Sequence, residues 1–233
     1  AATITNEIGI MKGIPHHENL VNFLKFQVSS ENNFYFFMEE CNGGNLEKYM
    51  LRNKYLFEEE QLEDFMVQIC RGYRVLLDAH VIHRDIKPEN IMLHNGTFKI
   101  ADFGFAKFIK PEEVGINANM SSKGTPLYMG PELFFGKVGS EKVDVFSLGI
   151  VLYRMAFKGI HPFYDEKKRF KSIKEYGAYV ESCPLRFPNR HTRSKELVDL
   201  IKQMLEKDKD RRISWQEIFK HPFLKSLDKP ALE

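Results

Sequence analysis

One dipeptide, Asn95-Gly96, constrains the local fold more than any other feature of this 233-residue chain. Short apolar runs flank it at 91–93 and 98–100. An Asn-Gly pair between two such runs is a strong signal for a β-hairpin, because a two-residue turn of this kind needs a positive φ at both positions. The sequence therefore predicts two paired strands whose register is fixed by the turn.

The open end of this hairpin collects polar side chains. In the predicted register Asn90 faces Ala101, so Asn90 and Asp102 become neighbours, within roughly 5 to 8 Å across the strands. Asp85 and Lys87 lie on the segment that enters the first strand. An amide oxygen and a carboxylate are hard ligands of the kind that Mg²⁺ prefers. The hairpin therefore predicts a cation site with a second carboxylate and an ammonium beside it.

The rest of the sequence is strand-forming near its start and mainly helical afterwards. Apolar residues at helical spacing predict a helix over 4–14 that ends at Pro15, and an amphipathic helix over 59–80. The run 142–157 is apolar nearly all round, which predicts a helix in the middle of a core, and it is too short to cross a bilayer. The other predicted elements are strands over 20–26 and 34–38, a connection at 42–45, a helix over 197–205 capped by Ser194, and a short helix opened by the capping box 214–217.

Charge and cysteine content bound the partners and the compartment. Lys plus Arg number 34 and Asp plus Glu number 32, so the charge balance indicates no nucleic acid and no membrane as partner. Cys41, Cys70 and Cys183 have no metal-like spacing, and an odd, sparse count is typical of reduced thiols. Because no basic and apolar leader opens the chain, we expect no secretory signal and a cytoplasmic protein.

The residues around the predicted hairpin resemble the signature motifs of eukaryotic protein kinases. The run 83–90, His-Arg-Asp-Ile-Lys-Pro-Glu-Asn, is similar to their catalytic loop, and Asp102-Phe103-Gly104 is similar to their metal-binding motif. Further along, Gly124-Thr125-Pro126 and Gly130-Pro131-Glu132 resemble the end of an activation segment. Either of the first two motifs alone could be accidental, but the two in order and joined by a hairpin are specific.

The resemblance covers the whole chain and implies an α+β, two-lobe fold. The implied parts are a partial small lobe of one helix plus the remaining strands over 1–38, a hinge over 39–45, and a complete, mainly helical large lobe over 46–233 with its activation segment at about 102–132. Within the family, the runs 41–46 and 101–106 look most like the autophagy-initiation kinase group. Calcium/calmodulin-dependent and Aurora-like kinases are close alternatives.

The same resemblance implies transfer of the γ-phosphate of ATP, with catalytic roles at the hairpin. Asp85 would accept or orient the hydroxyl of the substrate, because phosphoryl transfer needs its nucleophile aligned in line. Lys87 would contact the transferred phosphate, while Asn90 and Asp102 would hold Mg²⁺. Taken singly, each residue is more often a turn former or a cap. Their joint presence at one end of a hairpin favours the functional interpretation.

The resemblance places the rest of the nucleotide site before and beside the hairpin. Met38 would lie at the back of the pocket, and the backbone of 39–41 would bond to adenine. Glu7 would pair with a lysine that contacts ATP, although a helix commonly carries such a glutamate on its surface. Asn45 stands where many relatives have an acidic ribose contact, which is a departure from the family pattern. The residues assigned to the nucleotide are Glu7, Met38, Glu39, Cys41, Asn45, Met92 and Asp102.

Control by phosphorylation is implied by Arg84, because an arginine beside the catalytic loop can dock a phosphate on a flexible segment. Ser121 is the first candidate acceptor and Ser122 the second, although paired serines are common in polar loops. Thr125 would buttress Asp85 and Lys87. An activating kinase or a regulatory partner is therefore expected.

Further matches are expected to hold the fold. Asp144 begins a run, 144–149, that resembles the buried central helix of the large lobe, and Arg212 stands where the family places the partner of Glu132. The residues Met11, Phe23, His83 and Phe103 would stack as an internal hydrophobic spine. Each of those four would also pass as ordinary core packing.

Two parts of the family pattern have no counterpart in these residues. No G-x-G-x-x-G precedes Glu7, and no apolar strand supplies the lysine that contacts ATP. Either the chain begins partway into a longer protein, or the protein lacks these strands and is a non-catalytic pseudokinase or scaffold. We favour the first, because a non-catalytic protein has little need for the complete set of hairpin residues. The expected function is a kinase that uses ATP and Mg²⁺ on a protein substrate, and Lys87 with Gly124-Thr125-Pro126 favours Ser/Thr specificity. The 233-residue polypeptide by itself is expected to be a poor catalyst.

Overall fold

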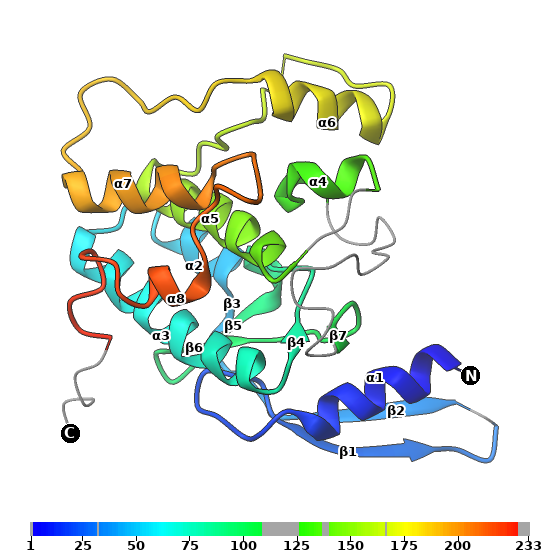
Figure 1. The fold of residues 1–233 in the computed structure, drawn as a ribbon. Coiled ribbons are helices and arrows are strands. Elements are labelled where there is room, and N and C mark those ends of the chain that lie inside the picture. Colours follow the sequence, from blue (N-terminus) through cyan, green and yellow to red (C-terminus); the bar gives the residue numbers. More distant parts are fainter. Residues whose placement is uncertain (1, 32, 109–125, 137–139, 166, 228–233) are drawn as a thin grey trace.

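The computed structural model describes residues 2–31, 33–108, 126–136, 140–165 and 167–227, with the backbone alone for 2–7. Small strands lie in the first half of the chain and the C-terminal part is mainly helical, so the mixed α/β architecture is the expected one (Figure 1). The helices are α1 (Ala2–Gly13), α2 (Leu46–Arg52), α3 (Glu59–Asp78), α4 (Pro131–Phe134), α5 (Lys142–Ala156), α6 (Ile173–Ser182), α7 (Lys195–Met204) and α8 (Trp215–Ile218), with the 3₁₀ helices η1 (Pro88–Asn90) and η3 (Pro126–Tyr128). The strands are β1 (Phe23–Val28), β2 (Phe34–Met38), β3 (Gly44–Asn45), β4 (Val81–Ile82), β5 (Ile91–His94), β6 (Thr97–Ile100) and β7 (Lys107–Phe108).

Strands β5 and β6 form the predicted hairpin in the predicted register, with Met92 opposite Lys99. The φ angles of the turn residues are positive, 50° at Asn95 and 84° at Gly96, as a two-residue turn of this type requires. A third strand, β3, pairs with β5 through residues 44–45, which the sequence assigned only to a connection. A strand of two residues is too short to leave a period in the sequence, so that assignment was incomplete.

Of the two strands predicted near the N-terminus, the structure confirms the bounds of one and changes those of the other. Strand β2 has the predicted bounds, whereas the run 20–26 divides between two partners. The Val21 N–H donates to the Ile100 carbonyl oxygen at 2.8 Å, and Leu20 also bridges to Ile100, so the start of the run lies buried against β6. Pairing with β2 begins only at Phe23. The prediction of one continuous strand is wrong, because the start of the run contacts β6 and the rest pairs with β2.

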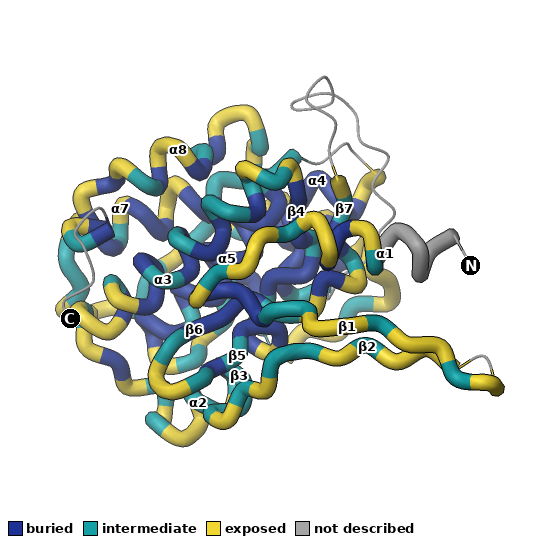
Figure 2. Tube along the Cα trace, turned by 90° about the horizontal axis from the view of Figure 1, so that it is seen from below, coloured by how far each residue is buried: buried dark blue, intermediate teal, exposed yellow. Residues whose placement is uncertain are grey.

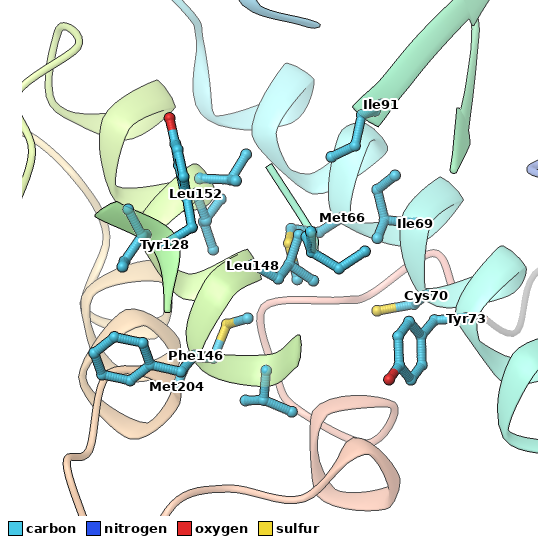
Figure 3. Packing of buried hydrophobic residues seen from close by; sticks show 14 of the residues in the cluster. Met66, Ile69, Cys70, Tyr73, Ile91, Tyr128, Phe146, Leu148, Leu152 and Met204 are labelled. Atoms are coloured by element: carbon cyan, nitrogen blue, oxygen red, sulfur yellow. The ribbon is translucent and has the colours of Figure 1, made fainter. Parts of the chain in front are cut away.

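The main core lies between α3, α5 and α7 (Figure 3). Helix α3 carries the predicted apolar stripe, and its Met66 meets Leu148 of α5 near the centre of the cluster. Helix α5 is buried along nearly all of its length, as a sequence apolar on every side predicts. Tyr73 of α3 stacks on Trp215 of α8 with ring centroids 3.6 Å apart. The two longest helical predictions are therefore confirmed.

The C-terminal helices begin at the predicted caps. The Ser194 side chain accepts a hydrogen bond from the backbone at the start of α7, and Ser214 forms a capping box with Glu217 at the start of α8. The sequence interpretation missed α6, which buries only three of its residues. The available signal was its cap, because the Ser172 side chain accepts the Glu175 N–H in a Ser-x-x-Glu pattern.

The β1–β2 hairpin extends away from the buried body and is exposed along most of its length (Figure 2). Its large exposed apolar side chains are Leu24, Val28, Phe34, Tyr35 and Phe37. This two-stranded sheet therefore has little core of its own, and its position depends on contacts at its base.

Two simple expectations about the whole chain can be compared with the described residues. Across the described ranges, no helix is both long and apolar enough to span a membrane. The three cysteines carry free thiols, as the odd and sparse count predicts.

Candidate active site

The loop from His83 to Lys87 joins β4 to η1 and delivers Asp85 into a buried position, 3% exposed. Its Oδ2 lies 2.7 Å from Lys87 Nζ and accepts a hydrogen bond from Asn90 Nδ2 at 2.9 Å. Asn90 Nδ2 also donates to the Asp85 carbonyl oxygen at 3.0 Å. The structure thus brings together the three residues predicted to be catalytic, with one carboxylate oriented by two donors.

Asp144, at the start of α5, supports this loop from the core. It is fully buried, and its carboxylate accepts the backbone N–H groups of His83 and Arg84, each at 2.8 Å, and the Tyr73 hydroxyl at 2.6 Å. Burial raises the pKa of Asp144, and the His83 ring and these donors oppose the rise. The φ of Arg84 is +68°, a conformation that costs a non-glycine residue energy unless its surroundings impose it. The bonds to Asp144 supply that constraint.

The residues predicted to be regulatory are only partly visible. Arg84 donates from Nε to the Phe105 carbonyl oxygen at 2.6 Å, and burial lowers the pKa of its guanidinium. It therefore lies against the segment that follows the hairpin. Ser121 and Thr125, the predicted acceptor and buttress, lie outside the described residues.

Beyond β6 the ladder continues for one more pair, because the Ala101 N–H donates to the Asn90 carbonyl oxygen at 2.9 Å. Asp102 follows directly, so it stands next to the residue that faces Asn90, as the hairpin predicts. Its φ is +63°, its side chain is exposed, and its Oδ1 accepts the Gly104 N–H at 3.2 Å. Asn90 is instead buried, with its amide nitrogen turned to Asp85.

These oxygens suit Mg²⁺ better than a metal that needs a closed set of protein ligands. Among the described residues, Asn90 Oδ1 accepts no hydrogen bond, and no group of three or more His, Cys, Asp or Glu side chains could hold a metal. Mg²⁺ usually keeps several waters and binds through one or two carboxylates and the phosphates of a substrate. One amide oxygen and one exposed carboxylate at the end of the hairpin fit that pattern.

The four residues predicted to stack as a spine are found together. The His83 and Phe103 rings are in an edge-on contact with centroids 5.4 Å apart. Met11 of α1 and Phe23 of β1 line the same small hollow as Phe103. This contact joins α1 and the β1–β2 sheet to the hairpin region.

The residues assigned to the nucleotide lie on several elements. Met38 is half-buried at the end of β2, Cys41 follows it in the linker, and Met92 of β5 pairs with Asn45 of β3. The Asn45 side chain accepts the Lys48 N–H at 3.0 Å and so caps α2. Burial and the nearby Glu39 raise the pKa of the Cys41 thiol. Glu7 lies in α1, and its side chain is outside the described residues.

The predicted partnership of Glu132 and Arg212 is present. Arg212 donates from Nη1 and Nη2 to the two Glu132 oxygens at 2.7 and 2.9 Å, and both side chains are buried. The same guanidinium donates to the carbonyl oxygens of Lys142, Glu206 and Lys207. This ion pair therefore joins α4 to α5 and to the loop that precedes α8.

Sequence reasoning missed the contacts that hold η3 beside the Asp85 loop. The Tyr128 carbonyl oxygen accepts the Ser147 hydroxyl at 2.7 Å, and the Tyr128 hydroxyl bonds to Arg154, which forms a two-pronged pair with Glu47. Tyr128 and Asp85 line one pocket. No local pattern could reveal these contacts, since the partners come from α2, α5 and η3.

His161 also holds η3, which leads to a pH prediction. Its Nε2 lies 2.7 Å from the Leu127 carbonyl oxygen, so the ring must donate there. Burial lowers the pKa of His161 from 6.5 to about 4, so this stability is complete above pH 6.5 and is lost as the pH falls toward 4. Between pH 7 and 4 the free energy of unfolding should fall by ~3 kcal/mol more in the wild type than in His161→Gln, measured by urea unfolding. Exposed His16→Gln should behave as the wild type, and equal pH profiles for wild type and His161→Gln would contradict the prediction.

Comparison with known proteins gives a family and a set of relatives. Residues 1–224 match the family model for the protein kinase domain. The chain is 33% identical over 233 residues to the serine/threonine-protein kinase ULK3 of Homo sapiens, covering 99% of the chain and 47% of that relative. It is 34% identical to the serine/threonine-protein kinase atg1 of Dictyostelium discoideum over 94% of the chain and 31% of the relative, and 34% identical to unc-51 of Caenorhabditis elegans over 96% and 26%. The chain spans half or less of the length of these relatives.

Proposed function

The chain belongs to the protein kinase family, and from that premise we propose that it transfers the γ-phosphate of ATP to a Ser or Thr hydroxyl of a protein substrate. The observation that carries this proposal is the buried Asp85 carboxylate, oriented by Lys87 and Asn90 at distances of 2.7 and 2.9 Å. The names of the relatives, all serine/threonine-protein kinases, support the Ser/Thr class of substrate.

Each residue of the loop has a role that its position allows. Asp85 accepts a hydrogen bond from the substrate hydroxyl and aligns it for attack, and the bonds from Lys87 and Asn90 limit its rotation. Lys87 Nζ, beside that carboxylate, lies where the transferred phosphate would meet the hydroxyl and can neutralise part of its charge. Asn90 Oδ1 and the Asp102 carboxylate would hold Mg²⁺, which would supply positive charge against the negative charge that develops on the phosphates.

The two-lobe arrangement is part of the same proposal. Residues 1–38 form the partial small lobe, 39–45 the hinge, and 46–233 the large lobe, with the activation segment at about 102–132. The contact between His83 and Phe103, with Met11 and Phe23 beside it, supports a spine that runs between the lobes. In this arrangement ATP lies between Met38 and Met92, with Glu39 and Cys41 at the adenine end and Asn45 near the ribose. Glu7 of α1 would pair with the lysine that contacts ATP.

The proposal also covers the regulation, the location and the partners of the protein. Arg84 lies against the segment after the hairpin, which supports docking of a phosphate on Ser121 by an activating kinase or a regulatory partner. Thr125 buttresses Asp85. The free thiols support a cytoplasmic location, and the balanced charge supports a protein partner and no nucleic acid.

A second candidate is a non-catalytic pseudokinase or scaffold that binds partners through the large lobe. The 233 residues contain neither the glycine-rich loop nor the ATP-contacting lysine, so by themselves they do not distinguish the two candidates. A test of phosphate transfer must therefore use the full-length protein.

The experiment compares phosphate transfer and Mg²⁺ dependence in that protein. We expect transfer from ATP to a generic Ser/Thr substrate, complete loss of transfer when Mg²⁺ is chelated, and a loss of about 10²-fold or more in Asp102→Asn. Exposed Asp210→Asn, remote from the hairpin, is the control and should keep the wild-type rate. No transfer and no Mg²⁺-dependent ATP binding by the full-length wild type would leave the scaffold as the better account.

A further inference from the structure

Lys99 of β6 is a lysine in an unusual place. It lies between Phe98 and Ile100, and all three side chains are buried, with Lys99 5% exposed. A strand that alternates its faces would normally leave a lysine here in water. An ammonium group withdrawn from water needs a partner of opposite charge, so its environment is informative.

The partner is Glu39, the first residue of the segment assigned to adenine. Its Oε1 lies 2.8 Å from Lys99 Nζ. Its Oε2 accepts the backbone N–H of Asn22 at 3.2 Å and Asn22 Nδ2 at 2.8 Å. The Glu39 N–H in turn donates to the Asn22 carbonyl oxygen at 2.9 Å. Partial burial raises the pKa of Glu39, but the hydrogen bonds from Lys99 and Asn22 lower it by more. The net effect is a lowered pKa, so the carboxylate is charged.

These contacts join three segments that are far apart in the sequence. Asn22 precedes β1, Glu39 follows β2, and Lys99 lies within the hairpin (Figure 1). The base of the exposed β1–β2 sheet also meets the hairpin region through the Val21 N–H, which donates to the Ile100 carbonyl oxygen, and through Phe23, which lines one hollow with Phe103. One carboxylate thus fixes the base of that sheet against the strand that ends two residues before Asp102.

We propose that Glu39 and Lys99 are positioning residues that set the distance between the adenine-contacting segment 39–41 and the metal-binding end of the hairpin. The inference rests on the proposed function, because it assumes that one ligand, MgATP, reaches both the segment of Glu39 and the hairpin end that follows Lys99. Adenine would bind beside Glu39, and the Mg²⁺–phosphate end would bind at Asp102, two residues beyond the strand that carries Lys99. A ligand that spans both ends gains affinity only if their spacing is correct in advance.

An ordinary stabilising ion pair would behave differently, and this difference provides the test. Loss of stability alone would lower the amount of folded protein and would weaken every ligand alike. Loss of positioning should weaken the binding of MgATP, which reaches both the segment 39–41 and the metal-binding end of the hairpin. It should leave the binding of adenosine unchanged, because adenosine reaches only the segment 39–41.

The variant is the double substitution Glu39→Gln and Lys99→Met, which removes both charges and leaves no buried charge without a partner. In the full-length protein we expect its Kd for MgATP to rise about tenfold, while its Kd for adenosine stays within about twofold of the wild type. The KM for ATP should rise more than kcat falls. Glu63→Gln is the matched control, because Glu63 likewise accepts a backbone N–H and a side-chain donor from one residue, Ser226, but lies away from the hairpin.

Unchanged MgATP affinity in the folded double variant would overturn the inference, and so would an equal loss for MgATP and adenosine. If the wild type transfers phosphate and either of these results is obtained, only the positioning role fails. If the full-length wild type binds no MgATP at all, the proposed function and this inference fail together. Single Lys99→Met, in which Glu39 keeps its bonds to Asn22, should give an intermediate rise in the Kd for MgATP.

Discussion

Full-length protein in which Asp85 is replaced by Asn is expected to transfer phosphate about 10²–10⁴-fold more slowly than the wild type. The amide has the size of the carboxylate but neither its charge nor its capacity to take up the proton of the substrate hydroxyl. Because Asp85 is buried and its neighbours are fixed, no other carboxylate of the loop can take its place without a change of backbone. The measurement is the initial rate of phosphate transfer at saturating MgATP.

The same variant should keep its nucleotide affinity and its fold. Asp85 contacts the Lys87 ammonium, and an amide oxygen can still accept that bond. Asp78→Asn, at the exposed end of α3, serves as the control for an Asp-to-Asn change and should leave the rate unaltered. If Asp85→Asn retained more than about a tenth of the wild-type rate, Asp85 would not be the group that aligns the hydroxyl.

The largest effect on stability is expected at Arg212. Its replacement by Met leaves the Glu132 carboxylate buried without its partner and removes the donor from three backbone carbonyl oxygens. Breaking a buried ion pair from one side costs about 3–5 kcal/mol, so the free energy of unfolding in urea should fall by that amount. Arg212→Met combined with Glu132→Leu should recover part of the loss, because no buried charge remains.

The neighbouring arginine provides a matched control. Arg211 is 75% exposed and lies 3.5 Å from Glu206, so Arg211→Met should change the free energy of unfolding by less than about 1 kcal/mol. Similar effects of the two substitutions would mean that burial of the Arg212 pair does not determine its contribution.

The parts of the fold that could be predicted from sequence are those fixed by local chemistry. The turn at Asn95-Gly96 sets its own register, because each residue supplies the φ that the turn requires. The caps at Ser194 and Ser214 are likewise local, since donor and acceptor are three residues apart. The division of the run 20–26 was not predictable in this way. Its two halves contact different strands, and apolar character alone does not say which.

The candidate site shows the same limit. The hairpin brings Asp102 next to the residue that faces Asn90, and a local turn is enough to predict this. The contacts that orient the loop come from Asp144, which is about sixty positions away in the chain, and only the tertiary structure brings it there. The sequence predicts an adenine contact for the backbone of Glu39, whereas the structure shows that its side chain forms an ion pair with Lys99. The signal for it was Lys99, a lysine within an apolar run.

The bonds from Asp144 have a consequence for how the protein opens. The backbone N–H groups of His83 and Arg84 donate to a carboxylate of α5, a helix that is buried along nearly all of its length. This loop therefore cannot detach by a local fluctuation of the surface, since its release exposes a charge within the core. The segment that carries Asp85 and the central helix form one cooperative unit, which should exchange its amide hydrogens only when the core itself unfolds. Substitutions in the core around α5 that lower global stability would then increase the fraction of molecules in which this loop is unfolded, even at positions that contact no substrate.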